Sequence, residues 1–107
     1  MFASIRRYRL QSGSMDDLLH LIDTDFAETI AEVDGFVAYE VVAGEEGELM
    51  TMTVFRDRDA AAQSDDMAAD WVRTTLAGQF DITRIDATLG EVAVSRAMAE
   101  MLEPAHH

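Results

Sequence analysis

The amino-acid sequence predicts one α+β domain whose elements follow the order β-α-β-β-α-β. Two observations support this fold class. Two segments repeat apolar residues at intervals of three and four, as one face of a helix does, and a glycine follows each of them. The other apolar segments are short, rich in β-branched and aromatic residues, and separated by loops that contain glycine, as strands are.

The first strand is expected over residues 2–10, because Phe2 and Tyr8 favour strands and the polar segment QSGS follows. A helix comes next. Its start is predicted at Ser14, whose hydroxyl can accept a hydrogen bond from a backbone N–H group of the first turn. Its apolar face repeats up to Gly35, where the helix is expected to end, and consists of Met15, Leu18, Leu19, Ile22, Phe26, Ile30 and Val33.

Strands over residues 36–43 and 49–55 are expected to form a hairpin, because the short loop GEEGE between them carries two glycines. Both strands are apolar on both of their faces. The second strand sets Leu49, Thr51, Thr53 and Phe55 against Met50, Met52 and Val54. The first strand is predicted to set Phe36, Ala38 and Val42 against Val37, Tyr39, Val41 and Ala43.

A second helix is predicted over about residues 59–77, beginning at Asp57 or Asp59 and ending before Gly78. Apolar and small residues follow one stripe along this helix. The stripe consists of Ala60, Ser64, Met67, Trp71 and Thr75, and is widened by Ala68 and Val72.

The last strand is expected over residues 82–94, with a kink at Gly90. A short amphipathic arm follows, whose apolar side is formed by Met98, Met101 and Leu102. The sequence shows no internal repeat and no linker. We therefore expect one domain at residues 1–94 and a C-terminal arm and tail at residues 95–107.

This order of elements is that of the ferredoxin-like fold, an antiparallel four-stranded sheet with both helices on one face. Two helices can cover only one face of such a sheet. The other face would expose a larger apolar patch than monomeric proteins usually show. We therefore expect the sheets of two copies to pack face to face as a dimeric α/β barrel, so that the protein is a homodimer.

The chain carries a strong negative charge. Its 8 basic residues are all arginine, 21 residues are acidic, and the formal net charge is −13. We expect no nucleic-acid partner, because the one basic cluster, RRYR in the first strand, is surrounded by an acidic whole. The acidic excess and the missing lysine fit either adaptation to high salt or a GC-rich genome.

The chain contains no cysteine, which excludes disulfides, thiolate nucleophiles and thiolate metal ligands. Arg6 brings charge close to the N-terminus, and no apolar run approaches the roughly 18 residues that cross a bilayer. We therefore expect a soluble cytoplasmic protein without a membrane partner.

Three segments carry a resemblance to a known family: DGFVAYEVV with the hairpin after it, MTVFRDRDAA, and the helix that ends in WVRTTLAGQF. Together they resemble the antibiotic biosynthesis monooxygenase (ABM) family of dimeric α+β barrels, over about residues 2–94, and are most similar to its small members of unknown function. The family includes heme-degrading enzymes, cofactor-independent oxygenases of polyketide-like aromatic molecules, isomerases, and members without demonstrated activity. The resemblance therefore implies the fold and leaves the function open.

Two positions depart from the family pattern. Phe55 stands at the end of the third strand, where the family often has tryptophan, and the helix at residues 59–77 lacks the histidine that the heme-degrading branch needs. We therefore do not expect heme. The resemblance implies that a ligand would lie in a cleft between the sheet and the two helices, and that no cofactor takes part.

The inner face of the second helix therefore supplies the candidate ligand-binding residues. Trp71 offers a flat ring, and its small neighbours Ser64, Ala68 and Thr75 leave a slot beside it. Tyr39 on the second strand adds an aromatic face with a hydroxyl group.

Purely structural interpretations of these residues stay open. Trp71 could be an ordinary core residue, and Tyr39 could pack at a subunit interface. The Ser64 hydroxyl could donate to the backbone carbonyl of the preceding turn, at Ala60.

Other polar residues are expected to serve the structure. Arg6, Arg7 and Arg9 alternate along the first strand and are expected to pair with acidic residues; the alternative is that one of them meets an anionic ligand. His20 lies near two aspartates at helical spacing, but it falls opposite the apolar face, so we expect no metal site. The acidic segments SDD and EE are interpreted as solvated charges.

Two functions of different classes follow. The first is a cofactor-independent monooxygenase, or a related enzyme, acting on a small aromatic or polyketide-like molecule in the cleft. The second is a non-catalytic module for small-ligand binding or for assembly. The second is strengthened by the lack of a general base, since no histidine is predicted in the cleft and Asp70 projects away from the stripe of Trp71.

Overall fold

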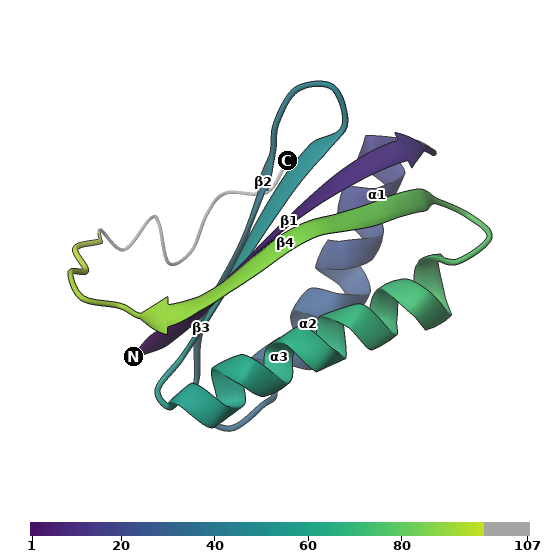
Figure 1. Cartoon of the computed structure of the whole chain (residues 1–107). Coiled ribbons are helices and arrows are strands. Elements are labelled where there is room, and N and C mark those ends of the chain that lie inside the picture. The colour runs from purple at the N-terminus through teal and green to yellow at the C-terminus, as the bar shows by residue number, and fades with distance from the viewer. Residues whose placement is uncertain (98–107) are drawn as a thin grey trace.

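The computed structural model describes residues 1–97 and contains a four-stranded antiparallel sheet that helices cover on one face (Figure 1). The strands lie in the spatial order β2-β3-β1-β4 and are β1 (Phe2–Ser12), β2 (Phe36–Ala43), β3 (Glu48–Phe55) and β4 (Asp81–Glu91). Strands β1 and β3 are the inner pair of this sheet, so their side chains form the floor under the helices.

The helices form two continuous segments, and each segment has a π-helical part. The first consists of α1 (Met15–Leu21), the π-helical η1 (Ile22–Phe26) and α2 (Ala27–Ala31); the second consists of α3 (Arg58–Trp71) and the π-helical η2 (Val72–Leu76). The order β-α-β-β-α-β confirms the predicted ferredoxin-like fold. No helix within residues 1–97 combines the length and the apolar character that crossing a membrane requires.

Local capping explains where both helical segments begin. The Ser14 hydroxyl accepts a hydrogen bond from the Asp17 N–H group at 3.2 Å, and the Asp57 carboxylate accepts one from the Ala60 N–H group at 2.8 Å. Of the two predicted starts, Asp57 is therefore the cap. The first segment ends at Ala31 with Glu32 as its C-cap, so the predicted end at Gly35 is wrong. Gly35 lies in the loop before β2 with a φ of +85°, a conformation that glycine adopts without strain.

The loop between β2 and β3 depends on a second glycine. Gly47 has a φ of +81°, and its carbonyl accepts a hydrogen bond from the Leu10 N–H group at 2.8 Å. A β-carbon at Gly47 would lie 2.4 Å from the backbone oxygen of Leu10, which is a clash. The hairpin loop can therefore pack against the end of β1 only with glycine at this position.

The predicted faces of β2 are wrong at one position. Phe36 pairs with Phe55 and Ala38 pairs with Val54, so one extra residue, Val37, is accommodated as a bulge. As a result Phe36 shares the helix-facing side with Tyr39, and its ring lies 5.9 Å from the Phe55 ring in an edge-to-face arrangement. Simple alternation had grouped Phe36 with Ala38.

Strand β4 differs from the prediction in its irregularity. It spans Asp81–Glu91, and Gly90 pairs regularly with Ala3, so the expected kink at Gly90 is wrong. The register with β1 shifts instead at two other places, around Ile85 between the pairs with Arg7 and Tyr8, and again between the pairs with Leu10 and Ser12. The predicted arm residues Met98, Met101 and Leu102 lie outside the residues that the structure describes.

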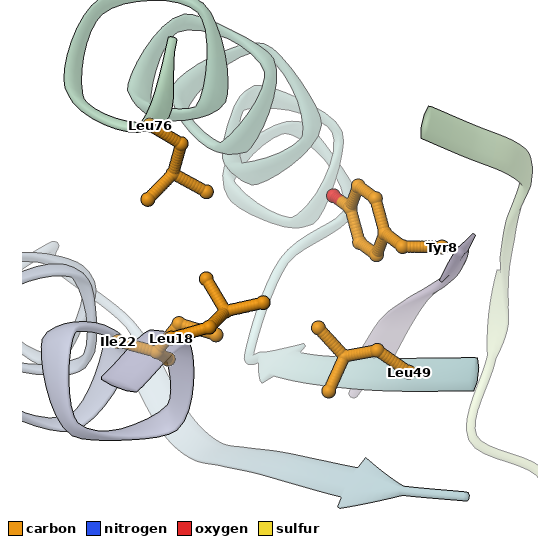
Figure 2. Packing of buried hydrophobic residues seen from close by; sticks show 5 residues of the cluster. All are labelled: Tyr8, Leu18, Ile22, Leu49 and Leu76. Atoms are coloured by element: carbon orange, nitrogen blue, oxygen red, sulfur yellow. The ribbon is translucent and has the colours of Figure 1, made fainter. Parts of the chain in front are cut away.

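The core lies between the sheet and the helices and has two clusters of buried apolar residues. One cluster consists of Tyr8, Leu18, Ile22, Leu49 and Leu76, the other of Phe26, Ile30, Phe55, Ala61 and Ala68. Figure 2 shows the first cluster, in which side chains of both helical segments point toward those of the sheet. Burying each large apolar side chain contributes about 1.5–3 kcal/mol, so these clusters fix the helices on this face.

The face of the sheet opposite the helices carries both apolar and charged residues. Val42 is 60 % exposed, Ile85 47 % and Met50 41 %. Two ion pairs lie beside them, Arg7 with Asp86 and Arg9 with Glu48, and their side chains are also exposed. We call this surface the outer face, and the helix-covered surface the inner face.

Candidate functional site

A cavity of about 20 Å³ lies on the inner face, between the sheet and both helical segments. Four of its lining residues are aromatic: Tyr8, Phe26, Tyr39 and Trp71. Most of the others are aliphatic, and Arg6 and Thr51 add polar groups. A cavity of this size holds about one water molecule, so a ring-sized ligand would require the lining side chains to move apart.

The alternation of β1 carries Arg6 into this cavity. Ser4, Arg6 and Tyr8 pair with Thr53, Thr51 and Leu49 of β3 and share the inner face with them. Arg6 and Ser4 are fully buried there. The intervening residues, Arg7 among them, face outward.

The Arg6 guanidinium is held by a set of side-chain oxygens. Its Nε donates to Thr51 Oγ1 at 3.1 Å, and its Nη2 donates to Thr53 Oγ1 at 2.6 Å. Its Nη1 forms an ion pair with Asp65 Oδ1 at 3.0 Å and lies 3.3 Å from the hydroxyls of Ser4 and Ser64. Ser4 in turn donates a very short hydrogen bond to the Asp65 carboxylate.

This arrangement places a permanent positive charge at the wall of an apolar cavity. A guanidinium stays protonated at all relevant pH values. Removing it from water is costly unless its N–H groups are bonded and its charge is paired, and here Asp65, with a side chain 23 % exposed, supplies the counter-charge. The charge of Arg6 is therefore fixed in position and shielded from solvent.

A second arginine braces Tyr8. Arg84 Nη2 donates to the Tyr8 hydroxyl and to the backbone carbonyl of Asp65, at 3.2 Å each. Its guanidinium carbon also lies 5.6 Å from the centre of the Tyr8 ring, within the range of a cation–π contact. Tyr8 is therefore fixed from the direction of β4.

The aromatic wall is built around Phe26. Its ring lies 5.6 Å from that of Tyr39, edge to face, and 5.4 Å from that of Trp71, in a tilted arrangement. Trp71 Nε1 donates to the Asp25 carboxylate at 3.0 Å. This bond links η1 with the junction of α3 and η2, and residues of both π-helical parts line the cavity.

The Tyr39 hydroxyl is a protonated donor at this wall. Burial raises the pKa of Tyr39 well above its ordinary value, and the nearby charge of Arg6 offsets only part of that rise. Within residues 1–97 no hydrogen bond engages this hydroxyl.

The predicted ligand-binding residues occupy different places. Trp71, Ala68 and Tyr39 line the cavity. Ser64 is fully buried and is not part of the cavity wall. Its hydroxyl donates to the Ala61 carbonyl at 2.5 Å and contacts Arg6. The expected bond to Ala60 is therefore wrong by one residue.

Thr75 is half-buried and is not part of the cavity wall, whereas its neighbour Leu76 is buried and lines it. A π-helical turn holds more residues than an α-helical one, so the inward position of η2 comes one residue later than predicted.

Sequence reasoning missed the polar centre of this site. Arg6 was expected to pair with an acidic residue, which the structure confirms, but Asp65 was interpreted as a solvated charge and is instead its partner. One indication was available, because Arg6 shares its strand phase with Ser4 and Tyr8, and hydroxyl residues alternate in the same way on β3. Arg7 and Arg9 pair with acidic residues on the outer face, and His20 is exposed on α1.

The ferredoxin-like fold and the aromatic-lined cavity between the sheet and the helices together define the class of protein. The chain belongs to the antibiotic biosynthesis monooxygenase family, whose model matches residues 1–73. This confirms the resemblance inferred from the sequence. No curated protein sequence matches the chain.

Solved structures share the fold at low identity. SnoaB, a cofactor-independent oxygenase from Streptomyces nogalater, superimposes with a TM-score of 0.63 at 14% identity, covering 91% of this chain and 94% of that one. A dimeric ferredoxin-like protein from an uncultured marine organism gives 0.67 at 12%, covering 91% and 98%. Rv0793 from Mycobacterium tuberculosis gives 0.64 at 17%, covering 90% and 98%. At these identities the likeness shows the fold.

Proposed function

We propose that this protein is a cofactor-independent monooxygenase that acts on a small aromatic or polyketide-like molecule in the inner-face cavity. The observation that carries the proposal is the pairing of a four-ring aromatic wall with the buried, permanently charged Arg6. Membership of the family and the fold shared with the oxygenase SnoaB support it.

The chemistry that fits this cavity uses the electrons of the substrate itself. An ionised aromatic substrate passes four electrons to one O₂ molecule, two C–H bonds at the reacting carbon are replaced by a C=O bond, and the second oxygen atom leaves as water. The aromatic and aliphatic walls exclude solvent, and in such an environment a fixed guanidinium stabilises developing negative charge more strongly than it would in water.

A second function, non-catalytic binding of a small ligand or assembly, is favoured by two observations. The cavity has a volume of only about 20 Å³, and none of its lining residues within the described part of the chain is a histidine, aspartate or glutamate. A protein that only binds its ligand needs no general base, whereas abstraction of a proton from the substrate does.

The proposal includes a homodimer formed through the outer face. Val42, Met50 and Ile85 give this face exposed apolar area, and together with Arg7 and Arg9 they surround a hollow of about 190 Å³ that side chains of a second copy could fill. One structural relative is described as a dimeric ferredoxin-like protein. We also propose that the protein is cytoplasmic and that residues 1–94 form its one domain.

The decisive experiment measures oxygen consumption with an anthrone-type phenol in the absence of added metal, flavin or heme. The matched control is Ala68→Phe, which fills the cavity and reports spontaneous oxidation of the phenol. Oxygen uptake by the wild-type protein above that of the variant supports the monooxygenase. A change in the emission of Trp71, the single tryptophan, without oxygen uptake supports the binding module. If neither response occurs, both functions are contradicted.

A further inference from the structure

The helices form the roof of the inner-face cavity, and this roof is divided between the two helical segments. The roof residues are Ile22 and Phe26 in the first segment, and Ala68, Trp71, Val72 and Leu76 in the second. Within residues 1–97 a single hydrogen bond joins the two segments, from Trp71 Nε1 to the Asp25 carboxylate at 3.0 Å. The two sides of the roof are therefore held together by apolar contacts and by this one bond.

The bond between Asp25 and Trp71 lies on the solvent side of the roof. Asp25 is exposed and Trp71 is half-buried, and the Trp71 ring rests against that of Phe26 at 5.4 Å. Water can replace the indole N–H group at an exposed carboxylate, so breaking this bond leaves no buried polar group without a partner. The roof can therefore open locally while the rest of the core stays folded.

The floor of the cavity, by contrast, is fixed. It is formed by strands that are paired in the sheet, and the Arg6 guanidinium is bonded to hydroxyls of β3 and to Asp65. The Tyr8 hydroxyl is held by Arg84. An opening of the cavity is consequently expected in the roof.

Both helical segments are irregular where they line the cavity. In each π-helical part a threonine hydroxyl donates to the backbone carbonyl four residues earlier, Thr24 to His20 at 2.9 Å and Thr74 to Asp70 at 2.7 Å. Such bonds offer the backbone carbonyl an alternative partner and often bend a helix. The roof is thus built from the two turns of the helices whose backbone bonding is least regular.

Of the two π-helical parts, η2 has more freedom to move. It ends its helical segment, and the turn after it is exposed: a β-carbon placed on Gly78 would have no atom within 4 Å. The other part, η1, continues into α2, whose Ile30 is fully buried in the core. The movable side of the roof is therefore η2 with the turn that follows it.

We propose that the bond between Asp25 and Trp71 is a latch that holds the roof closed, and that its release lets η2 move away from η1 and widen the cavity. The closed cavity of about 20 Å³ holds about one water molecule. Withdrawal of Val72 and Leu76, which η2 contributes to the roof, enlarges it from the side of the helices. That the opening admits a ligand rests on the proposed binding of a small molecule in this cavity.

Amide hydrogen exchange followed by NMR tests the latch without any ligand. Asp25→Ala removes the acceptor and is expected to speed exchange of the η2 amides, at residues 72–76, about three- to tenfold, while the amides of β1 and β3 keep their rates. Asp25→Asn keeps an acceptor oxygen and should stay within about twofold of the wild type. The matched control is Asp23→Ala, which removes an exposed carboxylate of η1 that has no hydrogen bond within residues 1–97 and should leave the η2 rates unchanged.

Three exchange results would overturn the latch. They are unchanged η2 rates in Asp25→Ala, an equal acceleration in Asp23→Ala, and an equal acceleration of the sheet amides, which would mean general destabilisation.

Naphthalene, a flat and uncharged probe, tests what the latch controls. Its association rate, followed by stopped-flow emission of Trp71, is expected to rise in Asp25→Ala by the same factor as the η2 exchange, because both require the same opening. An unchanged association rate with faster exchange would overturn the control of entry. If naphthalene binds neither the wild type nor the variant, the proposed binding of flat aromatic molecules is overturned, and the exchange rates alone decide the latch.

Discussion

Arginine side chains have different surroundings on the two faces of the sheet. Arg6 on the inner face is fully buried and bonded to hydroxyls and a carboxylate, whereas Arg7, its neighbour in sequence, lies on the outer face in an exposed pair with Asp86. The same side chain is therefore a fixed element of the core in one position and an exposed charge of the single chain in the next. The difference shows that burial, more than residue type, decides what an ion pair contributes.

The largest effect is expected from breaking the buried ion pair of Arg6 and Asp65. Arg6→Met should lower the free energy of unfolding by about 3–5 kcal/mol, because it leaves the Asp65 carboxylate and several buried hydroxyls without their partner. The outer-face control Arg7→Met breaks an ion pair whose side chains are exposed in the single chain, and it should cost much less than Arg6→Met. Urea denaturation of both variants measures the difference, and equal losses would contradict the contrast between the faces.

A second expected effect concerns the outer face as a dimer interface. Met50→Asp should convert the protein to a monomer and cost several kcal/mol of dimer stability, because it carries a carboxylate into the contact between two sheets, where removing a charge from water is costly. Gln63→Asp adds the same charge on the exposed side of α3 and should leave the dimer intact. Light scattering at micromolar concentration reads out the result. A stable wild-type monomer would refute the interface.

A smaller effect tests the cavity of the inner face. Ala68 is 4 % exposed and lines the cavity, so Ala68→Phe should overpack it at a cost of about 1–3 kcal/mol and abolish the response of Trp71 emission to planar aromatic molecules. Ala69→Phe, one position along on the exposed side, should change neither. Thermal melts and fluorescence titrations check both variants, and a retained response in Ala68→Phe would place the ligand elsewhere.

The smallest expected effect concerns the exposed ion pair of Arg7 and Asp86 on the outer face. The hydrogen bond from Arg7 lowers the pKa of Asp86 below its ordinary value of 3.8. Because the folded state holds this proton less tightly than the unfolded state, the pair stabilises the fold above that ordinary value, and the contribution is lost as the pH falls through the lowered pKa. Carboxylate chemical shifts in an NMR titration measure the pKa of Asp86.

The control for this titration is Arg7→Met, which should return the pKa of Asp86 to the ordinary range. An unchanged pKa in the variant would mean that another group lowers it. The coulombic interaction with Arg7 acts in the same direction as the hydrogen bond, so both are removed together.

The sequence was sufficient where local physics decides the outcome. Ser14 and Asp57 cap the helices because the bond joins residues three apart, and Gly35 adopts a positive φ without strain in the loop after the first helical segment. Strict alternation also gave the two faces of β3 correctly. The family could also be inferred from the sequence, because the order of elements and short segments such as DGFVAYEVV resemble those of the family.

The tertiary structure alone decided the centre of the candidate site. Alternation places Arg6 and Arg7 on opposite faces, but only the packing of the helices determines which of them is buried. The carboxylate that pairs with Arg6 stands 59 residues further along the chain, a separation that no local pattern encodes. The bulge at Val37 and the π-helical η2 likewise arise from the fit between elements, and they place Phe36 and Leu76 on the inner face. Local energies fix the elements, whereas the burial of charge and the register between elements depend on contacts that form only when the chain is folded.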